Sequence, residues 1–253
     1  EITHNSNIDA VAVVTPPKTH FEIAKSALEN SKHVVVAKPP VSSLEELEIL
    51  RDIAEEKSLV FAADFTFVYS EPVIAIKKAL DEGLFPRLRF VQSLRYGDDM
   101  RKHHVDRIRN TMFANGVDVI EDLIFHDISV LTYLFDTTFK VLWVNRVFTL
   151  SHDLCDTAYI DLQADGFPAH IGFSWTLPER KRQLVLYDSE KFLLFDDLVP
   201  KDKLKLFYLE TQTERLIAYG ESEPLFNMVS HLSLIHICRC RRRLRCRSRW
   251  SPY

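Results

Sequence analysis

The chain has 253 residues, of which 46% are hydrophobic and 27% are charged. This composition is typical of a globular protein with enough length for one large domain or two small ones. No apolar run approaches the roughly 18 residues of a membrane-spanning helix, which argues against a membrane protein. Residues 1–4 contain neither an initiator Met nor the start of a signal peptide, so we expect the chain to begin inside a longer protein.

Glycine and cysteine are unevenly used. The six glycines never lie within three positions of one another, so the chain has no G-x-G-x-x-G and no P-loop. We therefore expect no phosphate-binding turn for a dinucleotide within it. Cys155 is the only cysteine before residue 238. A single cysteine in the body of the chain indicates a reducing, cytoplasmic compartment without a disulfide framework.

Residues 232–253 differ sharply from the rest, with seven arginines and no acidic residue between 239 and 249. Such a segment can be a nucleic-acid-binding arm or a solvated tail. A third interpretation fits better, because CTGTCTCTTATACACATC, the end of a sequencing adapter, encodes residues 232–237. We predict that 232–253 is a non-native tail. Without its seven arginines, 25 basic residues face 36 acidic ones, which argues against a nucleic-acid partner.

The first 64 residues alternate strands and helices. Apolar runs predict strands at 8–14, 33–36 and 59–63, with helices at 18–30 and from Ser42 or Ser43 to about Lys57. Ser42-x-x-Glu45 has the spacing of a capping box. A β-α-β-α-β order with right-handed crossovers forms a parallel sheet, so we predict part of a doubly wound α/β fold.

The pattern changes after residue 67. Pro72 and Gly83 bracket one helix, and a second is predicted over 118–135 with an apolar stripe of Ile120, Ile124, Ile128, Leu131 and Phe135. Strand-like stretches follow at 87–96, 141–150, 157–164, 168–175 and 183–195. We expect Leu88, Phe90, Leu94 and Tyr96 to form the apolar face of the first stretch. Alternation with one wet face predicts a mostly antiparallel open sheet with helices on one face, an α+β domain.

Candidate functional residues follow the predicted parallel strands. Ligands of a doubly wound sheet bind beyond the carboxyl ends of its strands. These ends carry Thr15-Pro16-Pro17, Ala37-Lys38-Pro39 and Asp64. The ammonium of Lys38 can stabilise a developing alkoxide on a substrate. A solvated loop lysine is an equally good interpretation from position alone.

The helix over 118–135 carries a second candidate. Asp118, Asp122 and His126 recur every four residues, which makes Asp122 and His126 neighbours on one face. A carboxylate beside an imidazole fixes the orientation and tautomer of the ring for general-base work. The alternative is a surface pair that stabilises the helix by about 0.2–0.5 kcal/mol. No Cys/His spacing typical of a metal site occurs before the tail, so no metal is expected.

These segments together resemble one oxidoreductase family. The matching segments are residues 9–17 (DAVAVVTPP) with His20, residues 33–39 (HVVVAKP), Asp122-x-x-x-His126-Asp127, and the positions Ser174-Trp175, Pro178, Arg182 and Phe195-Asp196-Asp197. In their order and spacing they resemble the glucose–fructose oxidoreductase / inositol dehydrogenase (Gfo/Idh/MocA) family over residues 1–231. The resemblance implies that 1–67 is the C-terminal part of an incomplete Rossmann-like, dinucleotide-binding domain. It implies a substrate-binding and oligomerisation domain over 68–231.

The resemblance also implies an activity and a role for each matching residue. The expected reaction transfers a hydride between NAD or NADP and a hydroxyl carbon of a sugar, nucleotide sugar or cyclitol. Lys38 would contact the hydroxyl, His126 would take its proton, and Asp122 would position the substrate or the imidazole. The implied cofactor-binding residues are Thr15, Pro16, Pro17, His20, Ala37 and Lys38. The C-terminal sheet is expected to form a homodimer or homotetramer.

Two departures from the family pattern affect this expectation. Ala37 stands in place of the signature Glu, and the first β-α-β unit with its Gly-rich turn is not in the chain. We therefore expect this fragment to be inactive by itself, because a helix N-terminus holds the pyrophosphate. The alternative is a non-catalytic relative that acts as a binding or oligomerisation module. The residue that selects NAD or NADP would lie before Glu1.

Overall fold

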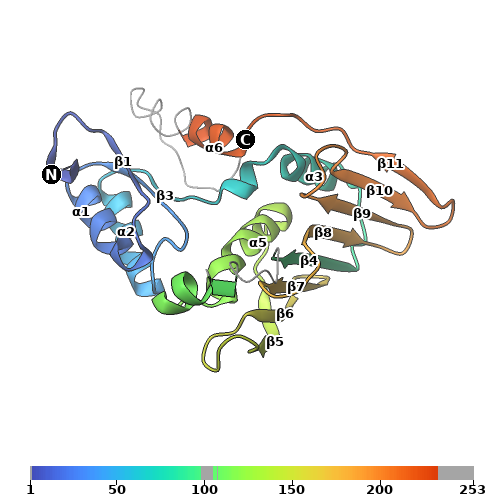
Figure 1. The fold of residues 1–253 in the computed structure, drawn as a ribbon. Helices are drawn as coiled ribbons and strands as arrows, with labels where there is room; N and C mark the ends of the chain where they lie inside the picture. Colours follow the sequence, from blue (N-terminus) through green and yellow to red (C-terminus); the bar gives the residue numbers. More distant parts are fainter. Residues whose placement is uncertain (1, 98–104, 107, 233–253) are drawn as a thin grey trace. The chain divides into compact units, whose positions relative to one another are not determined.

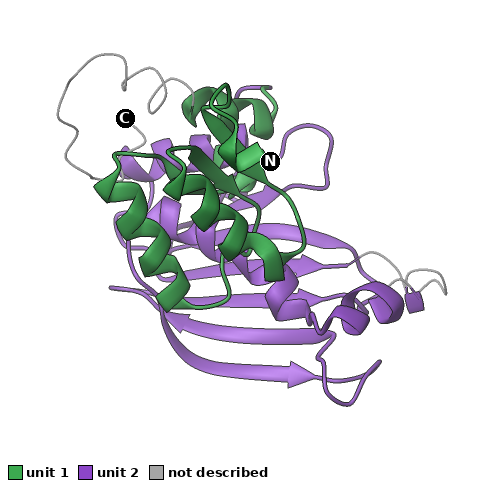
Figure 2. Cartoon of the chain, turned by 90° about the vertical axis from the view of Figure 1, so that its left-hand side faces the viewer, with its two compact units in different colours: residues 1–69, 222–253 green, residues 70–221 purple. Residues whose placement is uncertain are grey.

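The computed structural model describes residues 2–97, 105–106 and 108–232 (Figure 1). The chain forms two compact units, coloured separately in Figure 2: unit 1 contains residues 1–69 and the segment from Ser222, and unit 2 contains residues 70–221. Helix α6 (Pro224–Leu232) therefore groups with unit 1, although its residues up to 231 were expected to belong to the second domain. Within the described ranges, no helix is both long and apolar enough to cross a membrane.

Unit 1 is built around a three-stranded parallel sheet, as predicted. Strands β1 (Ala10–Val13), β2 (His33–Val36) and β3 (Phe61–Ala63) lie in that order. Helices α1 (His20–Glu29) and α2 (Leu44–Glu56) connect them. The buried core of the unit consists of apolar side chains from these elements: Val13, Ala24, Ala27, Leu28, Val34, Val36, Leu50 and Ala54.

Helix α2 begins after Ser43, one of the two predicted capping residues, and helix α1 starts two residues later than predicted. Ser43 is the N-cap of α2, and its hydroxyl oxygen accepts the N–H of Glu46 at 3.2 Å. The Glu46 carboxylate in turn accepts the N–H of Ser42 at 2.8 Å. The predicted Ser42-x-x-Glu45 capping box is therefore wrong by one residue, because Ser43 keeps an extended backbone and the first turn begins at Leu44. Helix α1 starts at His20 because Pro17–Thr19 form the 3₁₀ turn η2.

Two further elements complete unit 1. The 3₁₀ turn η1 (Ile2–His4) packs on α1, and η3 (Thr66–Tyr69) packs against α6. The amide of Asn227 in α6 donates to the carbonyl of Tyr69 at 3.1 Å, and the His231 ring lies 5.4 Å from the Tyr69 ring. Burial raises the pKa of Tyr69 and lowers that of His231. These contacts hold α6 in unit 1.

Unit 2 contains an eight-stranded sheet in the order β11-β10-β9-β8-β4-β7-β6-β5. The strands are β4 (Phe90–Tyr96), β5 (Lys140–Val147), β6 (Thr157–Gln163), β7 (Pro168–Ser174), β8 (Lys181–Tyr187), β9 (Lys191–Asp196), β10 (Leu204–Tyr208) and β11 (Thr213–Leu216). Every pairing is antiparallel except the one between β4 and β7. The predicted mostly antiparallel sheet is confirmed.

Helices of unit 2 cover one face of this sheet. Helix α5 (Val119–Phe135) lies against β6 and β7 and also packs on α3 (Glu71–Asp81), as Figure 1 shows. The π-helical turn η4 (Ile108–Met112) and the 3₁₀ turn η5 (Phe113–Asn115) precede α5. The side chains of β7 that face α5 are fully buried, as the alternation in 168–175 predicts: Ala169, Ile171 and Phe173.

One prediction about the strands of unit 2 is wrong, and the burial of another strand differs from what its apolar face suggests. The stretch 183–195 is two strands, because the Asp188 carboxylate accepts the N–H groups of Glu190 and Lys191 and forms a turn. In β4 the residues Phe90, Leu94 and Tyr96 share one face, as predicted, but that face is half-buried, and the fully buried side chains are Val91 and Ser93 on the other face. The reason is that α5 covers the other face of the strand. Strands β10 and β11 and helix α6 were not predicted.

Candidate active site

The carboxyl ends of the three parallel strands of unit 1 lie in register at one edge of the sheet. The N–H of Ala37 donates to the carbonyl of Val13 at 2.9 Å, and the N–H of Asp64 donates to the carbonyl of Val36 at 2.7 Å. The turns that follow β1, β2 and β3 therefore share this edge. It is the edge at which a parallel sheet offers its ligand site.

The turn after β1 is exposed and stiff. Thr15, Pro16 and Pro17 are all exposed, and prolines restrict the backbone φ angle at two of the three positions. The Thr19 hydroxyl lies 2.7 Å from Oγ1 of Thr15 and 2.8 Å from the carbonyl oxygen of Pro16. The predicted cofactor-binding residues of this turn thus form a surface that a ligand can approach.

His20 lies behind that turn. Only 1% of the residue is exposed. Its Nε2 lies 2.7 Å from the carbonyl oxygen of Thr15, and its Nδ1 lies 2.8 Å from the carbonyl oxygen of Pro39. Both ring nitrogens therefore face backbone carbonyls of the two turns and not the open edge of the sheet.

The turn after β2 carries the predicted catalytic amine. Ala37 and Lys38 are half-buried, and the Lys38–Pro39 peptide bond is cis. After β3, the Asp64 carboxylate accepts the N–H and the hydroxyl of Thr66. Unit 1 therefore contains all the predicted cofactor-binding residues and Lys38.

Asp118 caps α5 in unit 2. One carboxylate oxygen accepts the N–H groups of Ile120 and Glu121 at 2.9 and 3.0 Å, and the other accepts the Cys155 thiol at 3.0 Å. Burial, together with the hydrogen bond to Asp118, raises the pKa of Cys155 to about 12. Asp118 is thus occupied as a helix cap, and Cys155 stays a neutral thiol near pH 7.

Asp122 and His126 lie one turn apart on α5, both half-buried. The N–H of Asp122 donates to the carbonyl of Asp118 at 3.1 Å, which belongs to the first turn of the helix. The carbonyl of His126 accepts the hydroxyl of Ser129 at 3.1 Å. Helical spacing places the carboxylate and the imidazole on one face, as predicted.

Asp127, for which the sequence predicts no separate role, forms a buried ion pair. It is 5% exposed; one carboxylate oxygen accepts the Ser93 hydroxyl at 2.5 Å and the other pairs with Nε of Arg95 at 2.8 Å. Asp127 shares its side of α5 with Val130, Leu131 and Leu134, all buried. In the sequence, the carboxylate among apolar residues on one side of the helix could have indicated a buried partner. We infer that the buried pair with Arg95 sets the rotation of α5 about its axis.

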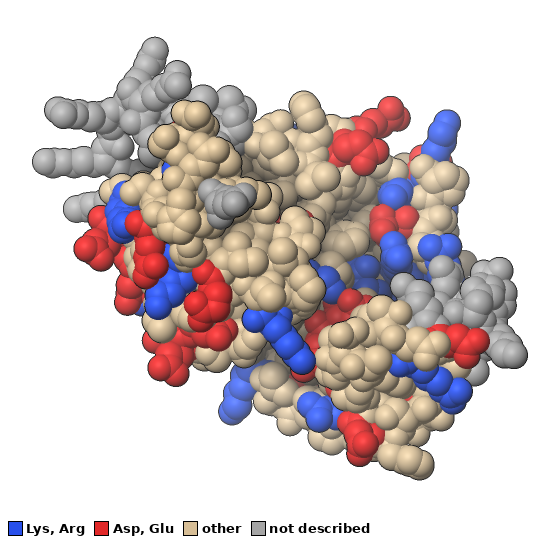
Figure 3. Space-filling model, turned by 60° about the vertical axis from the view of Figure 1, so that its left-hand side comes forward, with Lys and Arg blue, Asp and Glu red and all other residues tan. Residues whose placement is uncertain are grey.

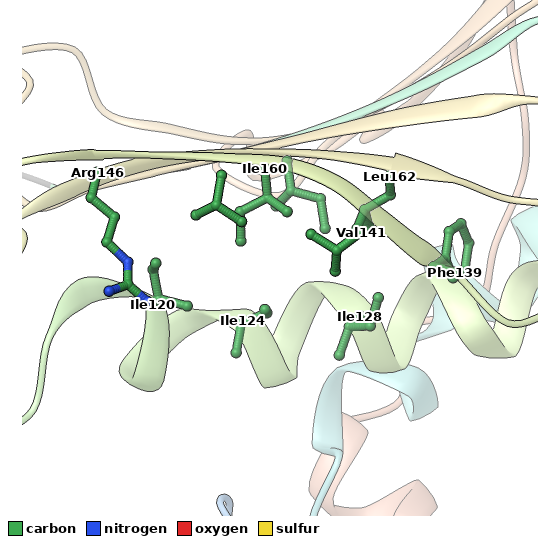
Figure 4. A pocket seen from close by; sticks show the side chains of 10 residues that line it. Ile120, Ile124, Ile128, Phe139, Val141, Arg146, Ile160 and Leu162 are labelled. Carbon is green, nitrogen blue, oxygen red and sulfur yellow. The ribbon is translucent and has the colours of Figure 1, made fainter.

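The adjacent side of α5 borders an apolar cavity of about 280 Å³ (Figure 4). Ile120, Ile124 and Ile128 line it from the helix, and Arg146 lies at one end. Of the predicted apolar stripe, Leu131 is buried and the isoleucines are only half-buried. Helical geometry places Asp122 and His126 about half a turn away from this cavity, so it is separate from the polar pair.

Neither the surface charge nor the arrangement of possible metal ligands points to a further site in the described residues. Acidic and basic side chains are interspersed on the face shown in Figure 3. In the part of the chain that the structure describes, no three His, Cys, Asp or Glu residues are placed to hold a metal ion. The functional candidates are therefore the turns of unit 1 and the polar face of α5.

Comparison with known proteins supports the family resemblance seen in the sequence. Residues 1–65 match the model of the Gfo/Idh/MocA family, described as an oxidoreductase family with an NAD-binding Rossmann fold. A segment covering 33% of the chain is 34% identical to the scyllo-inositol 2-dehydrogenase (NADP(+)) IolW of Bacillus subtilis. A longer match covers 76% of the chain at 26% identity with the UDP-N-acetylglucosamine 3-dehydrogenase of Acidithiobacillus ferrooxidans, and 57% of that protein.

Solved structures show the same fold. An inositol dehydrogenase homologue from Azotobacter vinelandii, complexed with NAD+, aligns with a TM-score of 0.80 at 21% identity over 94% of this chain and 70% of that chain. The chain spans only 23–28% of the length of the first curated relatives it matches. The predicted NAD-type cofactor is confirmed by the match of residues 1–65 to an NAD-binding family. Residues 1–65 thus match the Gfo/Idh/MocA oxidoreductase family, as the motifs indicated, and the fold of the described residues is similar to that of the solved structure.

Proposed function

We propose that the protein containing this chain is an NAD(P)-dependent dehydrogenase that acts on a hydroxyl carbon of a sugar, nucleotide sugar or cyclitol. The observation that carries the proposal is the Asp122–His126 pair on α5, in a chain whose residues 1–65 match an NAD-binding family. The named relatives act on an inositol and on a nucleotide sugar, which supports this substrate class.

Three residues of the chain have separate roles in the proposed reaction. A bound nicotinamide cofactor would supply the hydride-accepting chemistry at the carbon that carries the hydroxyl. His126 takes the hydroxyl proton as general base, and Asp122 orients the imidazole or the substrate. The ammonium of Lys38 contacts the hydroxyl oxygen and stabilises the negative charge that develops on it. The chain thus supplies orientation and proton transfer.

We propose that the turns of unit 1 hold the nicotinamide half of the cofactor. Thr15, Pro16 and Pro17 form an exposed, rigid surface, and the small side chain of Ala37 leaves room beside it. A phosphate-binding glycine turn is not part of this sequence. We propose that this turn lies in a segment before Glu1, so that the chain alone is inactive; the exposed residues of edge strand β1 leave room for a further strand.

We also propose a cytoplasmic homodimer or homotetramer. The face of the large sheet opposite α5 carries aromatic side chains on neighbouring strands, among them Tyr187, Phe192 and Phe207. The rings of Phe192 and Phe207 stack with centroids 4.6 Å apart. Aromatic side chains concentrated on one sheet face are typical of protein interfaces. Cys155, free and buried, agrees with a reducing compartment.

The second candidate function is a non-catalytic module that keeps the fold for binding or assembly. Ala37 favours it, because the family signature has a Glu at this position and an alanine cannot make its polar contacts. The presence of Lys38, Asp122 and His126 together favours the enzyme. The two candidates differ in turnover and not in fold.

The variant His126→Ala tests the enzyme. We expect kcat to fall about 10²–10⁴-fold with little change in cofactor affinity, which is the scale of general acid–base catalysis. The measurements are a panel of sugars, nucleotide sugars and cyclitols with NAD and NADP, and a cofactor fluorescence titration of the full-length protein. His152→Ala, in the exposed loop between β5 and β6, is the matched control.

The results separate the candidates. Unchanged turnover in His126→Ala would remove His126 from the mechanism. Tight cofactor binding without turnover of any substrate in the panel would favour the non-catalytic module.

A further inference from the structure

Each ring nitrogen of His20 lies within hydrogen-bond distance of a backbone carbonyl oxygen, and each such bond needs a proton on the nitrogen. A carbonyl oxygen only accepts hydrogen bonds, and a neutral imidazole has one N–H. Two carbonyl oxygens nevertheless lie 2.7 and 2.8 Å from the ring nitrogens. With 1% of the residue exposed, a bare ring nitrogen facing a carbonyl would be buried without a partner. Both nitrogens satisfy their neighbours only if both carry a proton.

We infer that His20 is a positioning residue that carries both ring protons and ties the turn after β1 to the turn that holds Lys38. The inference rests on the proposed function for the role of Lys38. The link itself stands on geometry within unit 1.

The sequence of the two turns explains why a side chain must supply the donors. The segments Thr15-Pro16-Pro17 and Lys38-Pro39-Pro40 contain four prolines, none of which has a backbone N–H. The strands before them are joined by backbone hydrogen bonds, but these proline positions offer only carbonyl oxygens. His20 begins α1, so the helix holds its ring beside both turns and provides the two missing donors.

The link anchors Lys38 from its C-terminal side. On the N-terminal side, the N–H of Ala37 is bonded to the carbonyl of Val13 at 2.9 Å. On the C-terminal side, the carbonyl of Pro39 accepts from His20. The backbone on both sides of Lys38 is therefore fixed to the turn region of β1. Loss of the His20 bond frees one side and lets the amine move, and a displacement of about 1 Å can cost about 10²-fold in rate.

The first test reads the ring protons directly. ¹⁵N NMR of the full-length protein with labelled histidine, assigned through His20→Phe, is expected to show protons on both ring nitrogens of His20 at pH 7. A neutral ring with one bare nitrogen would overturn the inference. This measurement needs neither cofactor nor substrate, so it decides the link even if the dehydrogenase proposal fails.

The second test separates positioning from stability. We expect His20→Phe to lower kcat about 10²-fold at 25 °C with the cofactor KM little changed. His20→Gln, which keeps one donor group, should lose less. The matched control is His33→Gln, in the same sheet but at the amino end of β2, which should retain kcat. If His20→Phe lowers only the melting temperature and turns over like the wild type, His20 is merely structural.

Discussion

The two units hold their functional residues by different physical means. In unit 1, a histidine bridges the backbone carbonyls of Thr15 and Pro39, at turns whose prolines supply no N–H donors. In unit 2, a buried charge pair between Asp127 and Arg95 fixes α5. A helix satisfies its own backbone hydrogen bonds, so its rotation against a sheet must be set by side chains. A proline-rich turn has unsatisfied carbonyls, so a donor side chain is what it needs.

The largest effect is expected from Asp127→Asn in unit 2. The change removes the carboxylate that lies 2.8 Å from Nε of Arg95, whose side chain is 14% exposed. Removing one partner of a buried pair costs about 3–5 kcal/mol, so we expect a loss near the lower limit because asparagine keeps one acceptor. Urea unfolding monitored by the fluorescence of Trp143 and Trp175, both in unit 2, measures it.

The matched control for this variant is Asp81→Asn. Asp81 pairs with Lys77 at 2.8 Å on α3 of the same unit, but half of its side chain is exposed. An i,i+4 pair of this kind contributes about 0.2–0.5 kcal/mol. Equal losses in the two variants would contradict the role of the Asp127–Arg95 pair.

The helix caps give the next largest difference between the units. Asp118 accepts two backbone N–H groups of α5 and the Cys155 thiol, whereas Ser43 accepts one N–H of α2 at the surface. We expect Asp118→Ala to cost about 2 kcal/mol and Ser43→Ala about 0.5–1 kcal/mol. Hydrogen exchange, read by mass spectrometry on peptides from each helix, measures both losses. A larger loss in α2 than in α5 would reverse the comparison.

The smallest expected effect is a pH-dependent loss of stability in unit 1. The Nδ1 of His33 accepts the N–H of Val60 at 2.9 Å, so the ring must be neutral there, and burial lowers the pKa of His33 despite the charge of Asp9. Because the folded pKa is lowered, this contribution is present above the ordinary value of about 6.5 and is lost as pH falls below it. Intrinsically corrected hydrogen exchange of residues 59–63 should therefore rise between about pH 6.5 and 5.

His33→Gln offers the control for that pH effect. Its amide oxygen can accept from Val60 without titrating. The same rise in exchange in this variant would show that another group is responsible.

The sequence predicted unit 1 better than unit 2 for a physical reason. A strand inside a parallel sheet carries a nearly continuous apolar run that marks it directly, as 33–36 does for β2, whose residues alternate between half-buried and buried. In an antiparallel sheet the sequence shows only an alternation of apolar and polar residues. That alternation does not decide which face of the strand is buried. In β4 the apolar-looking face of Phe90 and Leu94 is half-buried, while Ser93 is buried because it bonds to Asp127.

The sequence by itself determined the parallel and antiparallel parts, the family motifs, and the helical neighbours Asp122 and His126, because these depend on residues close together in the chain. Tertiary structure alone decided the pairing of Asp127 with Arg95 and the burial of His20 between Thr15 and Pro39. Those contacts join residues 32 and 19 positions apart. Local periodicity carries no signal at such separations; the packing of helices on sheets creates the contacts.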